Sequence, residues 1–72
     1  MAATFVLRFE RGSGHQPELK GHFLAWESGF LRPCATESHA THYTHSHIAA
    51  NVALRAAAAF RGARLAVLPV AQ

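Results

Sequence analysis

One segment in the second half of the chain restricts the possible folds more than any other. Apolar residues recur there every four positions, and alanines flank them. This apolar stripe consists of Ile48, Val52, Ala56 and Phe60. The spacing predicts an amphipathic helix whose small side chains let it lie close to a sheet. Thr44 is expected to cap a helix that begins at His45. Tyr43 and Ile48 have the spacing of a hydrophobic staple, and Gly62 is expected to supply the left-handed residue after the helix.

Strand patterns flank this helix on both sides. The expected strands are residues 4–10, 22–27, 30–32 and 64–70. Apolar residues alternate with other residues in the first of them, which is the period of a half-buried strand. A Ser-Gly turn at 28–29 joins the second strand to the third, and Pro33 is expected to end the third. Residues 11–21 are rich in turn formers and are expected to be a long mobile loop.

These elements predict one α+β domain over residues 1–72, with the order strand, strand, strand, helix, strand. We expect a small, mostly antiparallel sheet of three to four strands with the helix packed on one face. The expected core residues are Phe5, Leu7, Phe9, Leu24, Trp26, Val52, Phe60, Leu65 and Val67. A chain of 72 residues buries a small core, so a partner chain can add to it.

Three structural motifs suggest a resemblance. They are Gly-His-Phe-Leu at 21–24, Ala-Thr-His-Tyr-Thr at 40–44 before the helix, and Val-Leu-Pro-Val at 67–70. In these motifs and in its layout the chain resembles a loose group of short bacterial and phage proteins of uncharacterised function. The resemblance covers most of the chain, implies the same fold and implies no activity. This sequence differs from that pattern in its density of histidines.

Composition excludes several kinds of site and suggests a compartment. The chain has no Asp and its four acidic residues are scattered, which disfavours a carboxylate site for Mg²⁺ or Ca²⁺. Cys34 is the only cysteine, so no disulfide forms within the chain, and a lone thiol fits a reducing compartment. The first residues lack the pattern of a signal peptide, and no stretch is apolar enough to cross a bilayer. We therefore expect a cytoplasmic protein with no membrane contact.

Two residue pairs have the residue types of a nucleophile and its base. Cys34 with His39, or Ser38 with His42, would each supply a nucleophile and a base. Only Glu37 is near enough in sequence to orient either base, and no triad order is present. The sequence therefore predicts a protein that is not an enzyme and uses no cofactor.

Four histidines between positions 39 and 47 form the most unusual feature of the sequence. His39, His42 and His45 could converge on a transition metal ion if the segment curls, because neutral imidazole is a common ligand. In a second hypothesis, His45 and His47 receive an anion at the first helical turn. The simpler interpretation is a polar, solvated loop followed by a polar helical turn.

The net charge of +3 comes almost wholly from arginine, which raises the possibility of nucleic-acid binding. Arg8, Arg11 and Arg32 are the candidates for a basic strip. Phe23 or Trp26 would offer a stacking surface if exposed. A charge of this size, spread over the chain, falls short of a clear basic stripe.

The leading prediction is an interaction module that self-associates. A sheet of this size leaves edges that another chain can cover, either through the last strand or through the sheet face. Phe30, Leu31 and Val70 are the candidate contact residues. The expected partner is a second copy of the chain or another protein, with nucleic acid as the alternative and a metal bound by the histidines as the next.

Overall fold

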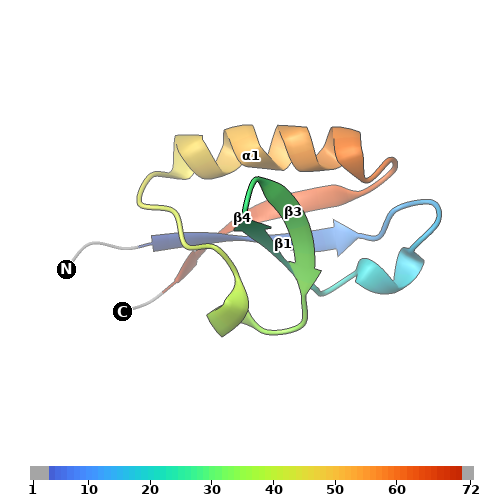
Figure 1. Ribbon diagram of the computed structural model, residues 1–72, viewed down its shortest axis with the longest axis horizontal. Helices are drawn as coiled ribbons and strands as arrows, with labels where there is room; N and C mark the ends of the chain where they lie inside the picture. The colour runs from blue at the N-terminus through green and yellow to red at the C-terminus, as the bar shows by residue number, and fades with distance from the viewer. Residues whose placement is uncertain (1–3, 71–72) are drawn as a thin grey trace.

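A four-stranded antiparallel sheet carries one helix across one of its faces (Figure 1). The computed structural model describes residues 4–70. Residues 1–3 and 71–72, which the prediction of one domain over 1–72 and of no signal peptide also covers, lie outside the described residues. Its elements are β1 (Thr4–Arg11), η1 (Pro17–Leu19), β2 (Phe23–Glu27), β3 (Phe30–Cys34), η2 (Glu37–His39), α1 (Ser46–Ala59) and β4 (Arg64–Val70). The strand order is β3-β2-β1-β4. This confirms the predicted α+β fold with its single helix on one sheet face.

Strand β1 organises the sheet because it has neighbours on both sides. Along one side it pairs with β4, from Thr4 opposite Val70 to Arg11 opposite Arg64. On its other side the register with β2 comprises one pair, Arg8 opposite Phe23. The N-terminal half of β1 is bridged there by the segment before the helix. Residues 41–43 therefore occupy the place that β2 leaves as it turns away toward β3.

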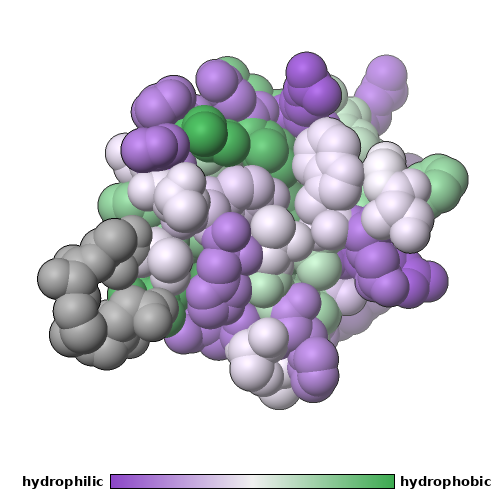
Figure 2. Space-filling view, turned by 60° about the vertical axis from the view of Figure 1, so that its left-hand side comes forward, coloured by the Kyte–Doolittle hydropathy of each residue, from purple (hydrophilic) through white to green (hydrophobic). Residues whose placement is uncertain are grey.

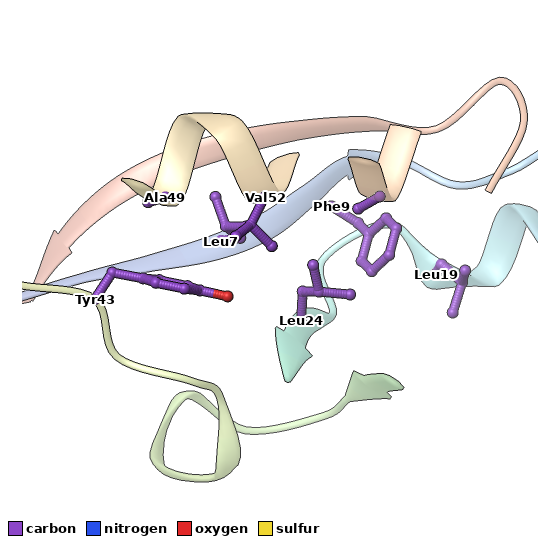
Figure 3. Packing of buried hydrophobic residues seen from close by; sticks show 8 residues of the cluster. Leu7, Phe9, Leu19, Leu24, Tyr43, Ala49 and Val52 are labelled. Carbon is purple, nitrogen blue, oxygen red and sulfur yellow. The ribbon is translucent and has the colours of Figure 1, made fainter. Parts of the chain in front are cut away.

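The main core lies between the sheet and α1 (Figure 3). Leu7, Phe9 and Leu24 are fully buried there. The ring of Phe9 meets that of Phe60 edge to face, with centroids 5.5 Å apart. The helix buries small residues against these large ones, namely Ala49, Val52 and Ala56. Because alanine projects so little, the helix backbone can approach the sheet while the strands supply most of the apolar volume.

The predicted helix exists and buries Val52, Ala56 and part of Phe60 as expected, but its start and the place of Ile48 were predicted wrongly. The N-cap residue is His45, with extended backbone and no capping hydrogen bond from its side chain, so Thr44 lies one residue outside. Ile48 is 41% exposed. With His45 as the N-cap, the two staple positions are Thr44 and Ala49 in place of Tyr43 and Ile48. A row of every fourth residue drifts around a helix by about 40° at each step. The buried line therefore combines steps of three and four residues and begins at Ala49.

The hairpin of β2 and β3 also departs from the prediction. Trp26 is 38% exposed and was wrongly predicted as core. Since β2 pairs with β1 only at its first residue, Trp26 lies beyond the part of the sheet that the helix covers. Strand β3 continues through Pro33, which faces Leu24, to Cys34. A proline is compatible with a ladder when its nitrogen points away from the partner strand at a sheet edge.

The segment between β1 and β2 is packed against the domain instead of extending from it. Gly12, Ser13 and Leu19 are buried, and Leu19 belongs to the main core. The Gly14 N–H donates to the carbonyl of Arg61 at 3.0 Å, which ties the segment to the end of the helix. The prediction of a long mobile loop missed the short η1 turn that buries Leu19. Among residues 4–70, no helix is long and apolar enough to span a membrane.

Tyr43 combines burial with an unsatisfied polar atom. Its side chain points into the core beside Leu7 and Leu24 (Figure 3), and its hydroxyl is buried without a hydrogen-bond partner among the described residues. An unpaired buried hydroxyl costs stability. We therefore expect Tyr43→Phe to raise the free energy of unfolding by about 1 kcal/mol, measured by urea denaturation. A stability loss in this variant would show that the hydroxyl does have a partner in solution.

The same burial predicts a pH dependence. Desolvation raises the pKa of Tyr43 above its ordinary value of 10.0. Above that pH the unfolded phenol loses its proton while the folded phenol still holds it, so stability falls as pH rises. Tyr43 is the only tyrosine, so tyrosinate absorbance of the native protein reports this group alone. Tyr43→Phe should remove this part of the stability loss at alkaline pH.

Candidate functional site

Among residues 4–70, strand β4 is paired on one side and free on the other. Its register shows which main-chain groups face outward. Phe5 exchanges hydrogen bonds with Tyr43, and the Phe9 N–H donates to His22, so both direct these groups away from β4. Such directions alternate along an antiparallel strand. The intervening residues of β1 therefore bond to Ala66, Leu68 and Val70, their partners in the register. Leu65, Val67 and Pro69 must direct their main-chain groups to the free side.

The free edge of β4 carries little of the protection that edge strands usually have. Arg64 is the only charged residue among the seven of this strand, and the rest are apolar. Leu65 and Val67 are half-buried and offer outward N–H groups, whereas Pro69 has none. Long apolar edges with free donors and acceptors are templates for another strand. Pro69 lies where its missing N–H removes no hydrogen bond to β1.

The opposite edge of the sheet is a poorer template. Ser28 and Gly29, both at positive φ (52° and 81°), form the two-residue turn that joins β2 to β3. This turn makes Glu27 and Phe30 a hydrogen-bonded pair, so alternation directs the groups of Leu31 and Pro33 outward. Of these two residues, only Leu31 has an N–H group to donate. The five residues of β3 thus offer one outward donor, and β4 offers two.

The residues predicted to make contacts do not form one surface. Phe30 is 71% exposed at the start of β3. Leu31 is half-buried and packs against the main core. Val70 is the last residue of β4, at the other edge of the sheet. The structure therefore separates the predicted set into a hairpin residue, a core residue and an edge residue.

The candidate basic strip is interrupted by acids. Arg8 lies 3.4 Å from a carboxylate oxygen of Glu10, and Arg32 lies 3.5 Å from one of Glu27. Arg11 is at the end of β1 opposite Arg64, beyond an irregularity in the register. Exposed ion pairs of this kind contribute little to stability but offset the positive charge offered to a phosphate.

The two aromatic residues considered for base stacking differ in position. Phe23 is half-buried and pairs with Arg8 on one side and with Cys34 on the other. Trp26 is more exposed, but it alternates with Phe23 across the pleat of β2 and belongs to the helix side of the sheet. The two side chains therefore lie on different faces and do not form one stacking surface beside Arg8.

The histidine-rich segment is a polar surface whose side chains bond to residues nearby in sequence and, through His42 Nδ1, to the Thr4 hydroxyl 3.4 Å away. His39 Nδ1 lies 2.6 Å from the Thr36 hydroxyl, and His42 Nε2 lies 3.3 Å from the carbonyl oxygen of Glu37. The rings of His45 and His47 stack with centroids 5.4 Å apart. Across residues 4–70 no three His, Cys, Asp or Glu side chains are grouped as metal ligands. His39, His42 and His45 are therefore not assembled as a metal site.

Figure 2 shows the side of the molecule toward which the N-terminal end of α1 points. Hydrophilic and intermediate surface dominates this view, and strongly hydrophobic surface is visible in small areas near the top and at the lower left beside the grey atoms. A broad apolar patch, which would mark a protein-binding face, is not seen on this side.

The two candidate nucleophiles lack the contacts that would activate them. Burial raises the pKa of the Cys34 thiol above its ordinary value, which lowers the thiolate fraction. The thiol donates to the carbonyl of Thr36 at 3.6 Å. The Ser38 hydroxyl lies 3.3 Å from the hydroxyl of Thr36, while His42 bonds elsewhere. Neither predicted pair is arranged as a nucleophile hydrogen-bonded to its base.

Sequence reasoning identified the last strand as a possible contact but not the residues on its free edge. Pro69 predicts from the sequence that the end of this strand lies at a sheet edge or beyond the ladder, because proline in a strand requires its nitrogen to face away from the ladder. The strand does lie at an edge. Comparison of the chain with protein-family models, curated proteins and solved structures finds no match. The resemblance to short bacterial and phage proteins stays a prediction.

Proposed function

We propose that this protein is a non-catalytic interaction module whose partner is a second copy of the same chain, joined through β4. The observation that carries the proposal is the free edge of β4, where Leu65 and Val67 direct unpaired main-chain groups outward. Strand addition at such an edge is a common mode of recognition. A second copy of the chain is present wherever the protein is made, and two-fold symmetric dimers are the commonest homo-oligomers.

The positions of the outward donors select one register for this pairing. If Ala66 faces Ala66 of the second copy across the two-fold axis, Leu65 of each copy faces Val67 of the other. Leu65 and Val67 then both donate and accept hydrogen bonds, and the missing donor of Pro69 falls outside the central pairs. Arg64 faces an apolar residue, Leu68, so no like charges oppose each other. The two sheets join into one.

Nucleic-acid binding is the alternative function. Its weakness is that Arg8 and Arg32 already face Glu10 and Glu27. Binding to nucleic acid would weaken steeply with added salt, whereas association through main-chain hydrogen bonds and apolar contacts would weaken little. A chain that stays monomeric and binds duplex DNA with such salt dependence would favour the alternative.

The proposed register predicts a specific cross-link. We expect Ala66→Cys, placed in a Cys34→Ser background, to form a disulfide-linked dimer as its main product under mild oxidation. Directly facing residues of a non-hydrogen-bonded pair have Cα atoms about 4.5 Å apart, within the reach of a disulfide. Non-reducing electrophoresis and the solution mass measure the product.

Arg64→Cys in the same background is the matched control. It lies on the same sheet face as residue 66 and is exposed, but the two copies of position 64 would be about 13 Å apart along the paired strands. A disulfide does not span that distance. Equal cross-linking of the two variants, or a monomeric mass for the wild-type chain at every concentration, would contradict the proposal.

A further inference from the structure

Of the two large apolar side chains that α1 leaves exposed, Ile48 and Leu54, Leu54 is the less covered. Leu54 is 72% exposed although it lies in the middle of α1. It follows the buried Ala49 by five residues, so its side chain is turned by about 140° around the helix axis. Ile48 precedes Ala49 and is turned by about 100° in the other direction. Leu54 and Ile48 therefore lie on opposite flanks of the helix.

The flank that carries Leu54 is the one above the free edge of β4. In Figure 1, α1 runs from left to right above the sheet, with the hairpin of β2 and β3 toward the viewer and β4 on the far side of β1. Seen from its N-terminal end, a right-handed helix turns clockwise as it recedes. This rotation turns Leu54 toward β4 and Ile48 toward β2.

From this geometry we infer that α1 packs against α1 of the second copy, with Leu54 at the contact. The inference rests on the proposed pairing of β4. An antiparallel strand pair has its two-fold axis perpendicular to the sheet, so both helices lie on the same face and run in opposite directions. The strand edges supply the directional bonds, and the helices add an apolar layer above them.

The spacing of the elements fits a direct helix contact. α1 packs against both β4 and β1, so its axis lies above the region between these strands. Neighbouring strands are about 4.8 Å apart, which places the two helix axes about 10 Å apart across the two-fold axis. Packed helices are separated by about 8–10 Å. Ala50 and Ala57 flank Leu54 on this side of α1, and their small side chains permit such an approach.

The test compares substitutions on the two flanks of one helix. We expect Leu54→Lys to raise the dimer dissociation constant at least about tenfold, because a charge would replace a leucine that the dimer contact buries. Leu54→Ala should raise it by a smaller factor. Ile48→Lys is the control, since Ile48 is also partly exposed, at 41%, but lies on the flank away from β4. Sedimentation equilibrium measures the constants, and circular dichroism checks that each variant folds.

The outcomes separate the helix contact from the strand pairing. Weaker association of both Leu54 variants with unchanged association of Ile48→Lys supports the contact. Unchanged association of Leu54→Lys, while Ala66→Cys still cross-links, overturns the helix contact and leaves the strand pairing in place. Equal weakening by Leu54→Lys and Ile48→Lys also overturns it, because the effect would then be one of added charge. A wild-type chain that never dimerises overturns both proposals.

Discussion

Replacing Phe9 with alanine is expected to leave the protein barely stable. Phe9 is fully buried and packs edge to face against Phe60 between the sheet and the end of the helix. Truncation of such a side chain costs about 3–5 kcal/mol, from lost burial and from the cavity left behind. A domain of this length has a total stability of about 4–11 kcal/mol. The Phe9→Ala variant should therefore melt roughly 15 °C or more below the wild type.

Phe30→Ala is the control for this prediction, because it removes the same group from an exposed position on β3. It should change the free energy of unfolding by less than about 0.5 kcal/mol. Both variants are compared by urea and thermal denaturation at one protein concentration, since association through β4 would make the melting temperature depend on concentration. Similar losses in the two variants would mean that the core is not centred on Phe9.

The second large effect is expected from a single methyl group at Gly12. A Cβ at this position would lie 2.6 Å from the Cα and the carbonyl oxygen of Pro17, and closer still to the carbonyl oxygen of Gln16. These are main-chain atoms, so no side-chain rotation relieves the clash. Overpacking of this kind costs about 1–3 kcal/mol or more, and we expect Gly12→Ala to lose at least that amount in urea denaturation.

Gly14→Ala is the control within the same segment. Its Cβ would meet one neighbouring atom, the carbonyl oxygen of Arg61, at 4.0 Å, which is an ordinary contact. Its effect should lie between neutral and a gain of about 0.4–1 kcal/mol from the less flexible unfolded chain. If Gly12→Ala were as stable as Gly14→Ala, the segment between β1 and η1 would not be packed as described.

Phe9 and Gly12 matter for the proposed function because their packing supports the part of the fold that positions the edge of β4. Phe9 belongs to β1, which pairs with β4, and Phe60 is the C-cap of α1 shortly before β4 begins. The segment containing Gly14 is bonded to Arg61 in the same connection. Loss of packing at this end would weaken the support of the first residues of β4. Dimerisation should therefore be compared only among variants that remain folded.

Much of the fold was accessible from local patterns. The last strand, Arg64–Val70, has the predicted bounds, and the first strand is one residue longer than predicted. Alternation and helical spacing report which face of an element is apolar, and that information is contained in neighbouring residues. Trp26 was mispredicted because alternation does not reveal where a strand leaves its neighbour. The candidate site was only partly accessible, because Pro69 indicates an edge but not a register.

The amino-acid order by itself determined the kinds of element, their sequence along the chain and most of the core, because these follow from propensities and from periods of two and 3.6 residues. Three other features were decided only by the tertiary structure. They are the burial of Ala49 in place of Ile48, the packing of residues 12–19, and the outward direction of Leu65 and Val67. Each depends on a contact between residues far apart in sequence. The free edge of β4 exists because β1 pairs with this strand on one side and with Phe23 and Tyr43 on the other.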